Sequence, residues 1–471
     1  MKVLKLIVDA EICSRMLIFV DNSQLMSIKY LIQNVAIVNE GEIHITDVLF
    51  YDEYIQKIGT IQPQDDFLVI NGTGKFLLPG VIDAQVHFRE PGLSNKGDIF
   101  SESRAAAAGG VTSFIDMPNT VPNVLTNELL KQKYEIASTN SAINYGFAMG
   151  ISASNMDELL AGDTAQYLMI TDDGLYFSGK GNILADNNDL MDHIFSRSKN
   201  LIAIHAEKEA IIEANEIKYK DEFGDNIPAK MHPIIRSEAA CYAASKDAID
   251  IANKYNARLH ILHLSTEAET HLFRNDIPLM EKNITCEVSV HHLWFSDADY
   301  DHLGMRIKWN PAIKSIKDKN GLMTALLNDK IDMITTDHAP HLLEEKDVPY
   351  FQSKSGAPMV QHTLSCMLSF YQEGIISLEK IVEKMCHNPA LIYNISKRGF
   401  IKEGYYADLV LIDFGESWIV SKDNILYKCG WSPLEGTQFN ATIRKTFVNG
   451  QLVYDNGKIM DNIHGKALTN S

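Results

Sequence analysis

Side chains that bind metal ions recur at the ends of apolar runs in the middle of the chain. Three runs end in histidine, at His87, His205 and His263, and two end in aspartate, at Asp173 and Asp337. Neutral imidazole and carboxylate are usual ligands of zinc and similar divalent ions. One such histidine alone is more often a structural group, and one such aspartate is often a helix cap. Five together predict a metal site, because a buried polar cluster without an ion leaves unpaired atoms.

Nucleophilic catalysis has less support in the sequence. Ser265 and Thr266 follow a histidine, but neither lies in a nucleophile motif such as G-x-S-x-G. His291 and His292 form a pair on a predicted strand, where adjacent residues face opposite ways, so at most one faces the centre. We interpret this pair as structural or as supporting the ligands.

Eight predicted strands must position the metal-binding side chains. Helical stretches such as Ser101–Ala108 and Ser237–Tyr255 lie between most of them. This alternation predicts a TIM (β/α)8 barrel, whose chemistry lies at the carboxyl ends of the strands. A doubly wound open sheet is the alternative, but no G-x-G-x-x-G follows the first strand. The strands are expected at Val81–His87, Val111–Met117, Ile143–Gly150, Tyr167–Thr171, Leu201–His205, Arg258–His263, Ile284–His291 and Ile331–Asp337.

Both ends of the chain are rich in short β-branched runs and hairpin signals. Asn-Glu-Gly at 39–41 and Asn-Gly at 449–450 each separate two such runs. We therefore expect residues 26–79 and 396–471 to form one small composite β-sandwich domain, and residues 80–395 to form the barrel. Strand-like patterning begins only at Ser27, so we interpret residues 1–25 as an extension that precedes a natural start at Met26.

The composition excludes some classes of partner. With 43 basic and 61 acidic residues among 471, the net charge is −18, which argues against nucleic acid and anionic membrane as partners. No run approaches the ~18 apolar residues of a membrane span. The six cysteines are scattered without a C-x-x-C pair, which favours a reducing, cytoplasmic compartment.

Five segments, in order along the chain, resemble the signature motifs of dihydroorotases. Residues 78–92 (LPGVIDAQVHFREPG) resemble D-x-H-x-H-x-R-x-P-G, and Met117–Thr120 matches M-P-N-T. Thr171–Gly174 resembles D-D-G, and His260–Thr266 resembles H-x-x-H-x-S-T. Thr336–His341 matches T-D-H-A-P-H, the most specific of the set. The resemblance covers the chain from about residue 30 to 460.

This resemblance implies particular roles and a cofactor. Asp173 would bridge two metal ions in place of a carboxylated lysine, His205 and His263 would hold one ion, and His87 and Asp337 would belong to the other. Zinc, one or two ions per chain, is the implied cofactor, and a homodimer is a candidate assembly by analogy. The residues matching positions that bind the substrate carboxylate and ring are Arg89, Asn119, Asn310 and His341.

Two positions depart from the family pattern. Gln85 stands where the family has the first histidine of its H-x-H pair. An amide oxygen can bind a metal ion, but it is neutral and a poorer zinc ligand than imidazole, so Gln85 is the weakest member of the ligand set. The family's N-P-P-L-R appears here as Asn310-Pro311-Ala312-Ile313-Lys314, which retains the asparagine.

The implied reaction is the reversible hydrolysis of (S)-dihydroorotate to N-carbamoyl-L-aspartate in de novo pyrimidine synthesis. A divalent ion would activate water for attack on the ring amide carbonyl. We expect Asp337 to accept the proton and to pass it to the leaving ring nitrogen. The long polar loop 342–358 is equally consistent with a lid over the bound ring and with a plain surface loop.

Two other functions remain open at this point. A hydantoinase or allantoinase would use the same scaffold, but those relatives normally carry a carboxylated lysine where this chain has Asp172-Asp173. A catalytically inactive barrel that serves as a partner subunit is the second alternative.

Overall fold

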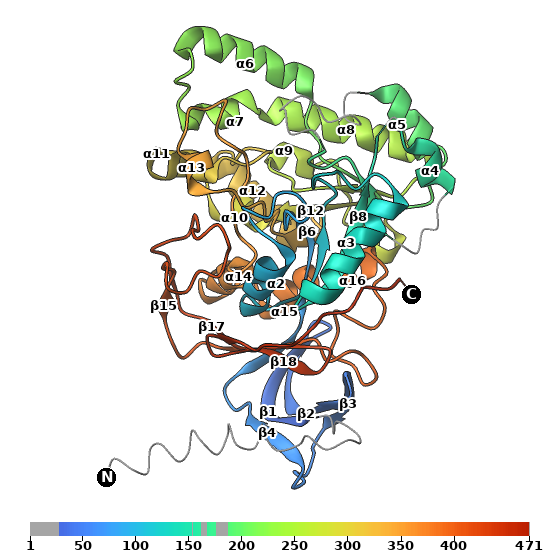
Figure 1. The fold of residues 1–471 in the computed structure, drawn as a ribbon, viewed down its shortest axis with the longest axis vertical. Coiled ribbons are helices and arrows are strands. Elements are labelled where there is room, and N and C mark those ends of the chain that lie inside the picture. The colour runs from blue at the N-terminus through green and yellow to red at the C-terminus, as the bar shows by residue number, and fades with distance from the viewer. Residues whose placement is uncertain (1–27, 153, 162–166, 176–186, 471) are drawn as a thin grey trace.

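The computed structural model describes residues 28–470 except 153, 162–166 and 176–186. The proposed extension at residues 1–25 lies outside the described residues. The chain forms a barrel that sits on a sheet built from both chain ends (Figure 1). No helix among the described residues is long and apolar enough to cross a membrane.

Eight parallel strands form the predicted TIM barrel in simple sequential order. The barrel closes between its first and last strands, where Val86 and His338 form a parallel bridge and the His87 N–H donates to the His338 carbonyl at 2.7 Å. The strands are β6 (Val81–Val86), β7 (Val111–Asp116), β8 (Asn144–Gly150), β9 (Met169–Thr171), β10 (Ile202–Ile204), β11 (Leu259–Ile261), β12 (Ile284–Ser289) and β13 (Met333–Thr335).

The seventh barrel strand is shorter than predicted. β12 ends at Ser289, and Val290–Trp294 forms the short helix α10. The prediction of a strand over Ile284–His291 is therefore wrong at its end. The alternation argument for His291 and His292 is wrong as well, because both side chains leave a helix and both are buried.

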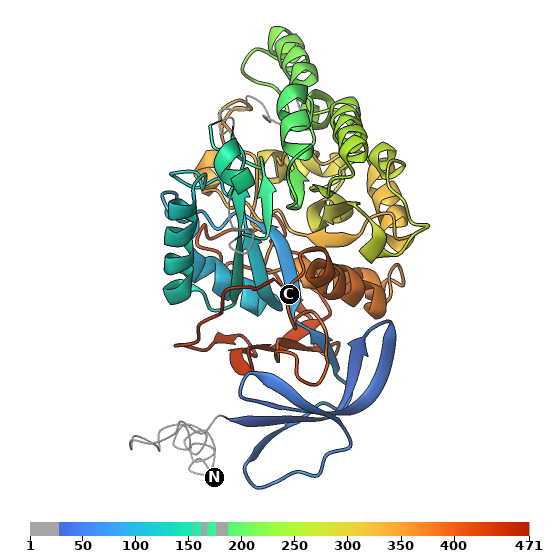
Figure 2. The same cartoon turned by 90° about the vertical axis from the view of Figure 1, so that its right-hand side faces the viewer.

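Helices cover the outside of the barrel, and their starts follow the local sequence (Figure 2). Asp98 caps α2 (Ile99–Ala108), and Ser237 caps α8 (Glu238–Tyr255), each by accepting a backbone N–H with its side chain. The remaining α-helices are α3 (Asn127–Asn140), α4 (Met156–Ala161), α5 (Asn188–Phe195), α6 (Glu209–Phe223), α7 (His232–Ile235), α9 (Glu267–Thr270), α11 (Tyr300–Leu303), α12 (Ile316–Leu327), α13 (Leu343–Lys346), α14 (Thr363–Gln372), α15 (Leu378–Val382) and α16 (Asn388–Ile392).

The two chain ends share one nine-stranded sheet below the barrel (Figure 1). The predicted hairpins are present at 39–41 and 449–450, and Asn449 and Gly450 both have positive φ, as the tight turn requires. The strands are β1 (Lys29–Asn39), β2 (Glu42–Tyr51), β3 (Tyr54–Gly59), β4 (Phe67–Asn71), β5 (Phe76–Pro79), β14 (Leu409–Asp413), β17 (Thr442–Val448), β18 (Gln451–Asp455) and β19 (Lys458–Ile459); β15 (Trp418–Ile419) and β16 (Gln438–Phe439) pair separately.

This sheet bends over on itself and encloses its own core. The ring of Tyr30 on β1 lies 5.2 Å from the ring of Phe447 on β17, although two strands separate β1 from β17 in the sheet. Asp408 joins the sheet to the barrel by accepting a hydrogen bond from Asn144 of β8 at 3.1 Å. The composite sheet thus supports the amino-terminal end of the barrel, opposite the predicted site.

A candidate metal centre at the mouth of the barrel

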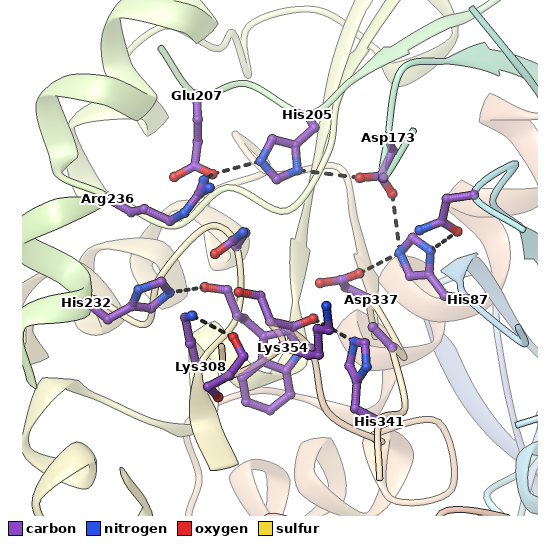
Figure 3. A pocket seen from close by; sticks show the side chains of 18 of the residues that line it. His87, Asp173, His205, Glu207, His232, Arg236, Lys308, Asp337, His341 and Lys354 are labelled. Carbon is purple, nitrogen blue, oxygen red and sulfur yellow. Dashed lines mark hydrogen bonds and ion pairs between the residues drawn. The ribbon is translucent and has the colours of Figure 1, made fainter. Parts of the chain in front are cut away.

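A cavity of about 370 Å³ opens at the carboxyl ends of the barrel strands. Figure 3 shows that His87, Asp173, His205 and Asp337 converge on one side of this cavity. The other side carries His232, Arg236 and Lys308 from α7 and the following segments. The strand ends therefore bring the predicted polar residues to one place.

Two groups of side chains have the composition and spacing of metal ligands, and they share Asp173. One group is Asp173, His205 and His263, and the other is His87, Asp173 and Asp337; within each, one ligand atom per residue lies within 4.8 Å of the others. His205 Nδ1 lies 3.4 Å from Asp173 Oδ1, and His87 Nε2 lies 3.4 Å from Asp173 Oδ2. The two oxygens of one carboxylate thus face the two groups.

The first group fits a divalent ion. Nδ1 of His263 is buried and has no hydrogen-bond partner within the part of the chain that the structure describes. An unpaired buried nitrogen of this kind costs free energy unless a ligand satisfies it. Two imidazoles and a carboxylate also match the donors that zinc prefers.

The electrostatic field of the site favours a cation. Burial opposes charge on His205, but hydrogen bonds to Asp173 and Glu207 outweigh it and raise the pKa of His205 to about 10. Burial is likewise outweighed at His87, where Asp173 and Asp337 raise the pKa to about 10. Burial, reinforced by the neighbouring His205, keeps the pKa of His263 well below its usual range, so that this ring stays neutral.

The backbone is held in the left-handed region at three of these positions. Arg89 has φ 69°, His263 has φ 33° and Asp337 has φ 44°. Such conformations are costly for residues with a Cβ and persist at functional sites because the surroundings enforce them. Gly174, with φ 64°, follows Asp173 where a Cβ would lie 2.1 Å from the Asn119 side chain, so this turn requires glycine.

A second cluster next to the metal groups consists of the residues predicted to bind the substrate carboxylate and ring. Arg89 Nη2 lies 3.1 Å from His341 Nε2, and Asn119 Oδ1 lies 2.7 Å from His87 Nδ1. Asn310 also lines the cavity, and its buried Oδ1 has no hydrogen-bond partner among the described residues. The structure therefore brings all four predicted substrate residues to the same cavity.

Sequence reasoning missed several residues that line the cavity or contact its lining. Glu207 accepts a hydrogen bond from His205 Nε2 at 2.8 Å and forms a buried ion pair with Arg236. A carboxylate two residues after a ligand histidine was the available signal for Glu207, because such groups often orient the imidazole. Lys96, whose Nζ lies 3.1 Å from His341 Nδ1, had no such signal.

The loop 342–358 forms a fixed wall of the cavity. Lys346 is fully buried and donates hydrogen bonds to the carbonyls of Lys308, Lys354 and Gly356 at 2.6 to 3.1 Å. Tyr350 within the loop is also buried, and its hydroxyl lies 2.8 Å from Nδ1 of His232. The loop is therefore anchored at Lys346 and Tyr350, and its residues 350–356 line the cavity, so the description as a plain surface loop is wrong.

Gln85 lies next to Asp173, the residue that the two metal groups share. Its side chain is fully buried, and its Nε2 donates to Asp173 Oδ2 at 3.2 Å. His291, in contrast, stacks on Trp309 with ring centroids 4.1 Å apart and belongs to neither metal group. Gln85 therefore forms a hydrogen bond to the shared carboxylate and is not a member of either metal group.

Comparison with known proteins agrees with this architecture. Residues 76–453 match the amidohydrolase family. A dihydroorotase of Methanosphaera stadtmanae is 30% identical over 80% of this chain and 85% of its own length, and one of Pyrococcus furiosus is 30% identical over 88% and 91%. An L-hydantoinase (dihydropyrimidinase) structure from Arthrobacter aurescens has a TM-score of 0.87 at 24% identity, covering 93% of this chain and 99% of that one. These two dihydroorotases are similar to the chain over most of its length, and the chain belongs to the amidohydrolase family.

Proposed function

We propose that this enzyme is a dihydroorotase, which interconverts (S)-dihydroorotate and N-carbamoyl-L-aspartate. The observation that carries the proposal is the adjacency of two clusters in one cavity: candidate metal ligands, and an arginine with hydrogen-bonding partners suited to a carboxylate. The dihydroorotase relatives support the same substrate.

We propose that Asp173, His205 and His263 hold the ion, and that it is zinc. When bound, a divalent ion lowers the pKa of water and polarises the amide carbonyl. Glu207 orients His205 by accepting a hydrogen bond from its Nε2–H group, which leaves Nδ1 directed toward Asp173. The cysteines Cys241, Cys286, Cys366, Cys386 and Cys429 are free, which supports our proposal of a cytoplasmic enzyme.

Asp337 is the proposed general base and acid. It is buried beside His87, whose Nε2 lies 3.0 Å from Asp337 Oδ1. Burial raises the pKa of Asp337 to about 6, even though the hydrogen bond to His87 opposes the rise. A carboxyl with this pKa can accept a proton from the attacking water and return it to the ring nitrogen near neutral pH.

Arg89 is the proposed anchor for the substrate carboxylate. Lys96 can only donate a hydrogen bond, so Nδ1 of His341 accepts and Nε2 carries the proton, which it donates to the Ser355 carbonyl at 3.0 Å. In this tautomer His341 Nε2 offers no acceptor to Arg89 Nη2, 3.1 Å away. Arg89 Nε donates to the Pro340 carbonyl at 3.1 Å, which leaves the two terminal nitrogens of the guanidinium to bind a carboxylate, with Asn119 and Asn310 placed to contact the ring.

A substrate comparison tests this proposal. Dihydrouracil has the ring of dihydroorotate without its carboxylate, so its kcat/KM is expected to be at least about 100-fold lower, as for loss of a buried charged partner. Hydantoin and allantoin should be turned over more slowly still. Preferential turnover of hydantoin or dihydrouracil would instead make the enzyme a hydantoinase-type amidase, and no turnover by the metal-loaded protein would favour an inactive partner subunit.

A further inference from the structure

The two candidate metal groups are unequal, and the difference centres on Asp173. The group with His205 and His263 offers two imidazoles and Asp173 Oδ1. The group with His87 and Asp337 offers one imidazole, one carboxylate of its own and the other oxygen of Asp173. Among the described residues, only the second group has a side-chain donor from outside both groups directed at its share of Asp173.

That donor is the side-chain amide of Gln85. Gln85 lies on β6 and His87 directly follows the strand, two positions further, so both side chains face the barrel mouth. The amide is fully buried and lies 3.2 Å from Asp173 Oδ2. Because two oxygens repel each other at this distance, the amide nitrogen faces the carboxylate, and an amide N–H cannot bind a cation.

Hydrogen bonds within the protein also engage both ring nitrogens of His87, whereas Gln85 Oε1 is buried and has no hydrogen-bond partner among the described residues. His87 directs Nδ1 at Asn119 Oδ1, 2.7 Å away, and Nε2 at Asp337 Oδ1, 3.0 Å away. With the Gln85 amide on Asp173, each side chain of the group already has a partner. The first group differs in this respect, because Nδ1 of His263 lacks a partner among the described residues.

We infer that each chain binds one catalytic metal ion, at Asp173, His205 and His263, and that the second group stays free of metal because position 85 carries an amide and not an imidazole. Resting on the proposed function, this inference gives the second group another task. His87 and Gln85 hold Asp337 and Asp173 in place by hydrogen bonds, so that Asp337 is a free carboxylate and not a metal ligand.

Metal counting tests the inference without any substrate. The purified chain is loaded with Zn²⁺, dialysed against metal-free buffer and analysed by mass spectrometry for zinc per chain. The wild type is expected to retain one ion, Gln85→His two, and Gln85→Met, a matched control of similar size without the amide, one. Two retained ions in the wild type, or one in Gln85→His, would overturn the inference.

Two ligand variants and a spectroscopic signal locate the ion. His263→Ala should lose the single ion, whereas His87→Ala should retain it; the reverse pattern would overturn the assignment. With Mn²⁺ in place of zinc, the paramagnetic resonance spectrum should report isolated ions in the wild type and a spin-coupled pair in Gln85→His. A chain that holds one ion but prefers hydantoin would contradict the proposed function and leave this inference intact.

Discussion

At the scale of single residues, the proposed proton transfers depend on Asp337. Asp337→Asn should lower kcat for dihydroorotate hydrolysis by about 10²–10⁴-fold, as for other positioned acid–base groups, while zinc content stays near the wild-type value. As a carboxylate with a pKa raised to about 6 by burial, Asp337 accepts protons above that pH, so the hydrolysis rate should fall as the pH drops through 6.

The opposite reaction provides the internal control for Asp337. Ring closure requires the protonated form, so the rate of cyclisation should rise where the rate of hydrolysis falls. A second ion on Asp337 would move this transition to lower pH. Retention of more than about a tenth of the wild-type rate in Asp337→Asn would make another group the base.

Lys96 acts through His341, and its removal should weaken substrate binding more than catalysis. Lys96→Met deletes the donor that fixes the His341 tautomer, so KM for dihydroorotate should rise about tenfold while kcat changes less than about threefold. Lys96→Arg keeps a donor and should recover part of the loss. An equal fall in kcat, or no recovery in the arginine variant, would exclude a positioning role.

At the scale of secondary-structure elements, one buried ion pair fixes the loops that carry the site. Lys133 of α3 lies 2.7 Å from Asp116 at the end of β7 and donates to the Met117 carbonyl at 2.8 Å. Asp116 in turn accepts the backbone N–H of Phe88, between two site residues, at 2.9 Å. The pair thus joins a helix to the ends of the first two barrel strands.

Loss of Lys133 should destabilise the fold strongly. Lys133→Met leaves the Asp116 carboxylate buried without its partner, so the free energy of unfolding should fall by about 3–5 kcal/mol in urea denaturation. Lys131→Met, on the exposed face of the same helix, should change it by less than about 0.5 kcal/mol. The double variant Lys133→Met/Asp116→Asn should recover part of the loss; full loss in the double variant would mean that packing, not charge, explains the effect.

The elements also explain what the sequence could predict. Strand ends such as Asp337 and His205 follow apolar runs, so the alternation of strands and helices placed them at one end of the barrel. The end of β12 was mispredicted because Val290 continues the apolar run although the backbone turns into α10. Lys96 and Lys346 escaped notice because their partners lie far along the chain or in loop carbonyls, which no local pattern records.

At the scale of the whole molecule, the composite sheet and the barrel have different roles. The sheet from both chain ends supports the amino-terminal end of the barrel, while the opposite end carries the cavity. The buried contact between Asp408 and Asn144 joins the two parts. Function therefore depends on the barrel mouth. Because the net charge of −18 does not attract an anionic substrate, its binding depends on the local cluster around Arg89.

The central claim is that a metal ion at the barrel mouth lets this enzyme act on dihydroorotate. Its most direct test measures the rate of dihydroorotate hydrolysis in zinc-loaded, chelator-treated and zinc-restored protein. We predict activity in the loaded protein, at least about a hundredfold loss after chelation, and recovery with one equivalent of zinc per chain. Undiminished turnover after complete removal of metal, or no turnover of dihydroorotate at one equivalent, would contradict the account.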